Sequence, residues 1–243
     1  GCSPLVPAVV MWLAIACAVI GAPIKDVTAL SPGAVRMRPE VTVGGTVIRT
    51  DPSRRRILLE DDGGGIEIDL GAIAVESAGS LEVGEVVEVT GRVGPGDFAP
   101  VVDAFRLESH GRRALDPPRR CDPESFFAGS DHARLAAVEG IVQQAWRERD
   151  DVILEMETSG RLFTAEIPGA VVADGFPAAG VDLQSIVDAA VIVAGPVVTH
   201  GNTRGEPLQP RVVVDRAEWF TIVSAGVTYT DMAVAPESIG GYR

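Results

Sequence analysis

The fold is decided by Val41–Leu70, VTVGGTVIRTDPSRRRILLEDDGGGIEIDL, and by a second stretch that matches it, Ala136–Ile167, AAVEGIVQQAWRERDDVILEMETSGRLFTAEI. The two stretches align without a gap for most of their length. Because self-similarity at a fixed offset marks a duplicated structural unit, the sequence predicts two copies of one small domain. The identical pairs, all at the same offset, are Gly45 with Gly140, Val47 with Val142, Leu59 with Leu154, Glu60 with Glu155, and Gly65 with Gly160.

Each copy reads as five β-strands. In the first copy, Val41–Thr50, Arg56–Asp62 and Ile66–Leu70 form a meander, and the third of these alternates apolar and polar residues with a period of two. After a polar stretch, Glu85–Val93 and Val101–Ser109 supply two more strands. Three strands, a connection and two further strands in about 70 residues favour the OB-fold, a five-stranded Greek-key barrel.

Glycines inside these strands support closure into a barrel. Gly44, Gly45 and Gly91 interrupt strands at points where a small sheet has to bend or bulge, and Gly91 in VEVTGRVG matches Gly195 in VIVAGPVV. In the second copy, Val181–Asp188 spaces its apolar residues as a short helix does. An OB barrel commonly carries a helix at this point of the chain.

The predicted fold is therefore all-β, with two tandem OB-fold-like five-stranded barrels after an N-terminal apolar signal or anchor segment. Pro117-Pro118 cannot continue a central strand, so we expect separate cooperative units and a first proteolytic cut between Arg112 and Arg120. The predicted boundaries are 1–24 for the signal peptide or membrane anchor, 25–39 for a lead-in, 40–109 for the first barrel, 110–133 for a proline- and arginine-containing linker, 134–223 for the second barrel and 224–243 for a linker to a further domain.

The N-terminal segment predicts targeting of the chain to a membrane. Leu5–Ala22 is apolar, and no charged side chain precedes Lys25, which gives a segment long enough to enter or cross a bilayer. Cleavage as a signal peptide and retention as an anchor both remain open. Leu13–Cys17 fits a loose lipobox, which makes Cys17 a candidate for lipidation. We expect an exported, periplasmic or otherwise extracytoplasmic protein associated with the membrane.

The charge disfavours a nucleic-acid partner. The 243 residues carry 21 basic and 34 acidic side chains, a net charge of −13. Glu40–Glu108 has 6 basic and 14 acidic side chains, and Arg134–Val223 has 7 and 13, so both barrels are acidic. Binding to phosphates needs a basic surface that releases counterions. A tandem OB protein that binds single-stranded nucleic acid is kept as the alternative, because the fold offers a surface for stacked bases.

No signature of an enzyme, metal site or cofactor site is found. The three histidines lack the spacing of zinc ligands. Gly63-Gly64-Gly65 lacks the lysine of a P-loop, and Ser130-Asp131-His132 is contiguous, unlike a catalytic triad. The carboxylates of Glu60-Asp61-Asp62 lack EF-hand spacing. We therefore predict no catalytic residue, no metal and no cofactor.

One stretch carries a family resemblance. The run Gly94–Val102, GPGDFAPVV, after a G-x-V…L-x-D-x-x-G-G-I pattern, resembles the tandem OB-like extracytoplasmic sensor region of bacterial membrane-bound histidine kinases and related signalling proteins. A G-x-x-V-E-G-x-V pattern of that family is echoed by Ala136–Val142. The resemblance implies a non-enzymatic sensory or partner-binding module that passes a signal to an output domain outside this chain. A purely structural stalk is a further alternative.

Candidate binding residues follow from the place of the loops in an OB barrel. The hairpin between the first two strands and the loop before the last strand flank the usual binding face. A small ligand or a protein partner is expected there, and a homodimer is left open. The candidates are Arg54, Arg55, Asp97 and Phe98 in the first copy, and Trp146, Arg147, His200 and Asn202 in the second.

Overall fold

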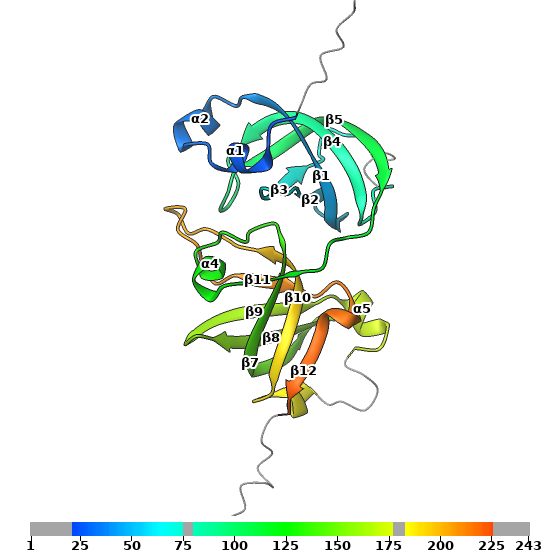
Figure 1. Ribbon diagram of the computed structural model, residues 1–243, viewed down its shortest axis with the longest axis vertical. Coiled ribbons are helices and arrows are strands. Elements are labelled where there is room, and N and C mark those ends of the chain that lie inside the picture. Colours follow the sequence, from blue (N-terminus) through cyan, green and yellow to red (C-terminus); the bar gives the residue numbers. More distant parts are fainter. Residues whose placement is uncertain (1–20, 75–79, 177–182, 226–243) are drawn as a thin grey trace, which may run out of the picture.

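The computed structural model describes residues 21–74, 80–176 and 183–225, and these form two β-barrels stacked along the long axis of the molecule (Figure 1). The predicted all-β fold with two OB-type barrels is confirmed. Cys17 and most of the expected signal or anchor segment lie outside the described residues. Within the described ranges, no helix has the length and apolar character needed to cross a membrane.

The first barrel closes as an OB-fold does. Its strand order is β1-β2-β3-β5-β4, and β4 pairs back onto β1. All neighbours are antiparallel except β3 and β5. Every predicted strand of this copy appears with ends shifted by three residues or fewer. The strands are β1 (Glu40–Asp51), β2 (Arg56–Glu60), β3 (Gly65–Asp69), β4 (Glu85–Gly94) and β5 (Val101–Arg112).

The second barrel repeats this topology with an interrupted fifth strand. β10 pairs with β7 to close the barrel, and β11 runs parallel to β9. β11 pairs with the end of β10 and β12 with its beginning, so the two together take the place of β5. The elements are β6 (Arg119–Arg120), β7 (Leu135–Glu148), β8 (Asp151–Thr158), β9 (Arg161–Ile167), α5 (Gly169–Ala173), η1 (Leu183–Ile186), β10 (Ala190–Val198), β11 (Arg211–Val213), η2 (Ala217–Trp219) and β12 (Phe220–Ser224).

The sequence alignment of the two copies slips at the first hairpin. Both first strands have a register shift at the same place, at Ile48 in β1 and Gln143 in β7. Just before this shift along the chain, Val47 pairs with Leu59, but Val142 pairs with Met156 and not with Leu154. The second hairpin has longer strands and a tighter turn. The identities at Leu59, Glu60 and Gly65 are therefore not structural equivalences, because an ungapped alignment cannot register a change in hairpin length.

Two short helices close one end of the first barrel. They are α1 (Ile24–Thr28) and α2 (Pro32–Arg36), and they bury Ile24, Val27 and Val35 against the barrel core. Ser31 caps α2 by accepting a hydrogen bond from the Ala34 amide. A helix of five residues is too short to show a helical period of apolar residues in the sequence. The sequence therefore predicts only a lead-in segment here.

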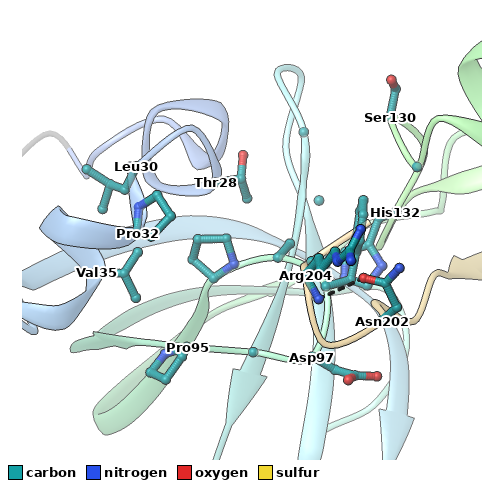
Figure 2. A pocket seen from close by; sticks show the side chains of 18 of the residues that line it. Thr28, Leu30, Pro32, Val35, Pro95, Asp97, Ser130, His132, Asn202 and Arg204 are labelled. Atoms are coloured by element: carbon teal, nitrogen blue, oxygen red, sulfur yellow. Dashed lines mark hydrogen bonds between the residues drawn. The ribbon is translucent and has the colours of Figure 1, made fainter. Parts of the chain in front are cut away.

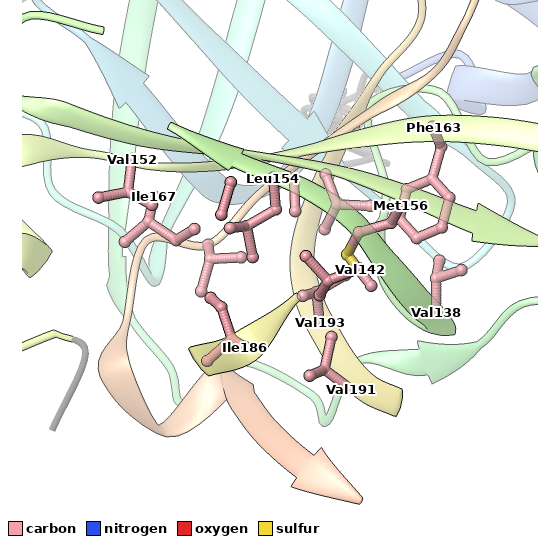
Figure 3. Packing of buried hydrophobic residues seen from close by; sticks show 14 of the residues in the cluster. Val138, Val142, Val152, Leu154, Met156, Phe163, Ile167, Ile186, Val191 and Val193 are labelled. Carbon is pink, nitrogen blue, oxygen red and sulfur yellow. The ribbon is translucent and has the colours of Figure 1, made fainter. Parts of the chain in front are cut away.

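The segment 110–133 is more than the expected linker. It contains α4 (Pro123–Phe127), whose Phe126 and Phe127 pack into the core of the second barrel. Phe126 meets the ring of Phe163 edge to face, with centroids 5.4 Å apart. Figure 3 shows this core from the side of η1, where Ile186 points among the strands. The segment thus contributes to a domain in addition to joining two.

The two barrels pack on each other through an apolar cluster of their own. The register shift turns Ile48 away from the first core, as a β-bulge does, and Ile48 packs with Leu58, Ala133 and Leu135. All four of these side chains are buried. Since these residues come from both barrels, the barrels form one packed pair.

Polar contacts cross the same interface. The Glu60 carboxylate accepts hydrogen bonds from the Arg134 guanidinium at 3.1 Å and from the Leu135 amide at 3.0 Å. Nearby, Arg49 lies 3.9 Å from Glu166 and 4.0 Å from Asp215. Burial raises the pKa of Asp215 to about 6, against the pull of Arg49. The Asp215 carboxylate is thus a partly buried group at the interface, beside an arginine of the other barrel.

Candidate ligand cleft between the barrels

A cleft of about 910 Å³ opens where the two barrels meet. Its walls come from three parts of the chain, namely the N-terminal helices, two loops of the first barrel and two segments of the second (Figure 2). Neither barrel alone forms it. The residues that line it are Thr28, Leu30, Pro32, Val35, Arg36, Gly63–Gly65, Pro95–Pro100, Gly129, Ser130, His132 and Asn202–Gly205.

The loop Pro95–Pro100 before β5 is held from the side of the second barrel. His200 Nδ1 lies 2.6 Å from a carboxylate oxygen of Asp97. A side chain at Gly201 has no room, because its Cβ would lie 2.4 Å from the carbonyl oxygen of Asp97. Two loops from different barrels therefore touch backbone to backbone, and only glycine allows this approach.

Phe98 fixes the same loop against the segment before β7. Its ring meets that of His132 edge to face, with centroids 5.5 Å apart. A Cβ at Gly129 would come within 2.3 Å of the Phe98 ring. Aromatic contacts of this geometry contribute roughly 0.5–1.5 kcal/mol beyond burial. The contacts of Phe98 with His132 and Gly129 therefore hold the loop of the first barrel against the second barrel at the cleft.

His132 is a mostly buried imidazole at the cleft. Burial lowers its pKa to about 4, with a smaller contribution from nearby His200. The Thr199 amide donates a hydrogen bond of 3.1 Å to its Nδ1. An accepting Nδ1 places the proton of the neutral ring on Nε2. His132 is thus a neutral hydrogen-bond donor at neutral pH.

We expect His132 to make the fold acid-sensitive. Its folded pKa of about 4 lies below the ordinary value of 6.5, so the unfolded state binds more protons between these values and stability falls as the pH drops from 6.5 to 4. The contribution is about 3 kcal/mol from this shift. Chemical denaturation at pH 7 and pH 4 measures it, with His132→Gln as the comparison, because glutamine keeps a hydrogen-bond acceptor without titrating.

The raised pKa of Asp215 acts in the opposite direction over part of this range, since its folded state gains a proton as the pH falls through about 6. The comparison between the wild type and His132→Gln cancels that effect. The exposed residue His110 serves as the control through His110→Gln. Equal pH dependence in the wild type and His132→Gln would contradict the prediction.

The structure gathers half of the predicted binding residues at one place. Asp97, Phe98 and Asn202 line the cleft, and His200 bonds to Asp97 beside it. The sequence placed these residues on two separate barrels. Their meeting was not foreseen, because no local pattern reports how two domains dock. Ser130 and His132 fall in the segment that the sequence predicts to be a linker, and the contiguous run Ser130-Asp131-His132 does not indicate a binding site.

The other four predicted residues lie away from this cleft. Arg54 is beside Asp51 in the first hairpin, and the Arg55 guanidinium donates to the Ile73 carbonyl. Trp146 and Arg147 lie near the end of β7, where Trp146 is 40% exposed. Arg54 and Arg55 lie at the first hairpin of one barrel, and Trp146 and Arg147 lie at the first hairpin of the other. Each pair flanks the face that an OB barrel offers to ligands, and the hairpin with Trp146 is called the hairpin surface below.

Two of the clustered carboxylates of Glu60-Asp61-Asp62 have structural partners, namely Glu60 at the interface between the barrels and Asp61. Asp61 accepts hydrogen bonds from the amides of Gly63 and Gly64 at 2.8 Å, and from the Ile24 amide at 2.9 Å. In the described part of the chain, no group of three or more His, Cys, Asp or Glu side chains is placed to hold a metal ion.

Three solved structures that resemble this chain do so distantly. No protein-family model matches the chain, and neither does any curated protein. A hypothetical protein, YgiW, from E. coli is 18% identical with a TM-score of 0.29, over 36% of this chain and 87% of that one. Aspartyl tRNA synthetase from Entamoeba histolytica is 11% identical with a TM-score of 0.35, over 46% of this chain and 22% of the synthetase.

A murine DNA-binding protein bound to double-stranded DNA is 7% identical with a TM-score of 0.34, over 76% of this chain and 99% of that one. None of the three is a histidine kinase sensor. Identities and scores at this level transfer no function to this chain, and the cleft between the barrels is the feature that indicates one.

Proposed function

We propose that this protein is a non-enzymatic, exported binding module that takes up a small ligand in the cleft between its two barrels and passes that event to an output domain. The observation that carries the proposal is that both barrels build the cleft. The loop Pro95–Pro100 of the first barrel faces Gly129–His132 and Asn202–Gly205 of the second. The volume of about 910 Å³ falls within the range of small-molecule sites.

Because the cleft lies between the two barrels, ligand binding can change how the barrels are arranged. A ligand that contacts both barrels favours the relative position in which it makes most contacts, and it can shift that equilibrium only by its difference in affinity. The pair His200–Asp97 bridges the barrels at the cleft, while the ion pair of Glu60 and Arg134 bridges them elsewhere in the interface. Ligand binding is thereby linked to the interface that sets the arrangement of the barrels.

A thermal-shift screen of small metabolites on the full chain tests this proposal. Ser130→Trp fills the cleft from an exposed position, and we expect it to abolish every ligand-induced rise in melting temperature. Trp146→Ala removes the aromatic side chain from the separate hairpin surface, so the rise should persist in that variant. Loss of the rise in Trp146→Ala with retention in Ser130→Trp would place the ligand on the hairpin surface and contradict the proposal.

Two further results decide between function classes. Salt-sensitive binding of a labelled single-stranded oligonucleotide at micromolar protein would favour the nucleic-acid alternative, which the net charge of −13 opposes. Steady hydrolase or transferase activity of the purified chain would contradict a non-enzymatic role. We expect neither.

A further inference from the structure

The charge of the cleft differs from that of the whole chain. Its lining contains two arginines, Arg36 and Arg204, and one carboxylate, Asp97, in a protein of net charge −13. Both arginines are exposed, and neither has a carboxylate partner within the described residues. Asp97 is engaged by His200. The lining therefore presents two uncommitted cations and an anion that is already partnered.

The neutral polar groups of the lining are donors as well. The hydrogen bond from the Thr199 amide to Nδ1 leaves the Nε2–H of His132 as a donor. The hydroxyls of Ser130 and Thr203 line the same wall, and their side-chain oxygens make no hydrogen bond within the described ranges. Asn202 is already committed, because its side chain bonds to Glu206 and to two backbone amides. The free hydrogen-bonding capacity favours an acceptor-rich ligand.

The opposite wall is apolar. Leu30, Pro32 and Val35 come from the N-terminal helical segment, and Pro95 begins the loop from the first barrel. Figure 2 shows the first three on one side of the cleft, with Ser130, His132, Asn202 and Arg204 on the other. A ligand that fills the cleft thus meets hydrogen-bond donors and Arg204 at one end, and at the other end a mainly apolar wall that also carries Arg36, the last residue of α2.

We infer that the ligand class is a small organic anion, a carboxylate or phosphate carried on an apolar ring or short chain. Its charged group lies toward His132 and Arg204, and its apolar body packs on Leu30, Pro32 and Val35. Arg36 contributes to the same field. This inference rests on the proposed function, since it names the ligand of the same cleft. Arginine suits both anions, because its planar donors match carboxylate and phosphate oxygens.

A matched set of soluble probes tests the class. Benzoate, phenyl phosphate, benzamide and benzylamine share one ring and differ in charge, and inorganic phosphate lacks the ring. Binding to the full chain is followed by NMR through the amides of cleft glycines such as Gly64, Gly96 and Gly205. We expect benzoate or phenyl phosphate to bind at least about tenfold more tightly than benzamide and benzylamine, which corresponds to about 1.4 kcal/mol.

The double variant Arg36→Gln/Arg204→Gln should weaken binding of the anions about tenfold and leave benzamide unchanged. The control Arg112→Gln/Arg149→Gln removes the same charge from exposed positions outside the cleft lining and should change binding less than about twofold. This control separates local contacts from the overall field, which is screened beyond about 10 Å at 0.1 M salt. An equal effect of the two double variants would overturn the inference.

The remaining outcomes separate this inference from the proposed function. Benzamide or benzylamine bound in the cleft as tightly as the anions overturns the ligand class and leaves the proposed function standing. Inorganic phosphate bound as tightly as phenyl phosphate overturns the role of the apolar wall. If no probe and no metabolite shifts the cleft glycines, both proposals fall. A preference between benzoate and phenyl phosphate identifies the anionic group.

Discussion

Replacing Gly195 by alanine is expected to destabilise the second barrel by at least about 3 kcal/mol. Gly195 lies in β10 with φ +151°, and an added Cβ would sit 1.9 Å from the Val213 carbonyl oxygen. Val213 belongs to β11, which completes the barrel beside β10. Neither strand can move aside without breaking the pairing of β10 with β11. The expected fall in melting temperature exceeds about 10 °C for a domain of this size.

The control for Gly195→Ala is Gly175→Ala. Gly175 also has a positive φ, +108°, but nothing lies within 4 Å of an added Cβ. It should therefore cost about 1 kcal/mol, from backbone strain alone. Circular dichroism during urea unfolding measures both variants. A cost for Gly195→Ala no greater than for Gly175→Ala would show that β10 and β11 do not approach as closely as described.

Replacing Gly65 by alanine is expected to uncouple the two barrels. Gly65 begins β3, and its added Cβ would lie 1.8 Å from the carbonyl oxygen of Ala133, at the interface with the second barrel. The barrels have to separate to admit the methyl group, which weakens the nearby contacts of Glu60 with Arg134 and Leu135. Each barrel keeps its own core, so folded structure remains.

The wild type should unfold in one thermal transition, because the shared interface couples the barrels, and Gly65→Ala should unfold in two. Calorimetry distinguishes these results. Gly64→Ala, one residue earlier, is the matched control, since its Cβ would meet Ile24 at an ordinary 3.5 Å. Two transitions in the wild type would instead support the independent units that the proline-containing linker predicts from the sequence alone.

The strands and the closure of each barrel were predictable because local pattern dictates them. Alternating apolar residues define the strand faces, and glycines mark the tight crossings. Gly91 and Gly195, which the sequence aligns, both face a carbonyl oxygen of a neighbouring strand, at 2.5 Å and 1.9 Å from an added Cβ. Gly45 and Gly140 face carbonyl oxygens in the same way, at 2.9 Å and 2.8 Å. A position with no room for a side chain is occupied by glycine, and this glycine can be recognised in the sequence.

No comparable local pattern in the sequence indicates how the two barrels dock. Ile48 reads as one more strand residue, yet the bulge turns it into the interface. Glu60 reads as part of an acidic turn, yet its carboxylate joins Arg134 and Leu135. His132 lies in a polar run of the sequence, which does not predict that its side chain is buried. Contacts between residues more than 70 positions apart depend on two completed surfaces, which no local window contains.

The sequence by itself therefore determined two OB-type barrels and the loops that carry candidate side chains, because hydrophobic period and glycine placement act over a few residues. Only the tertiary structure decided which loops meet. The tertiary structure brings Asp97 and Phe98 of one barrel close to His132, His200 and Asn202 of the other. Loops of two barrels thereby line a single cleft. The physical reason is that docking is set by the shape and charge of whole surfaces, which exist only after each barrel has folded.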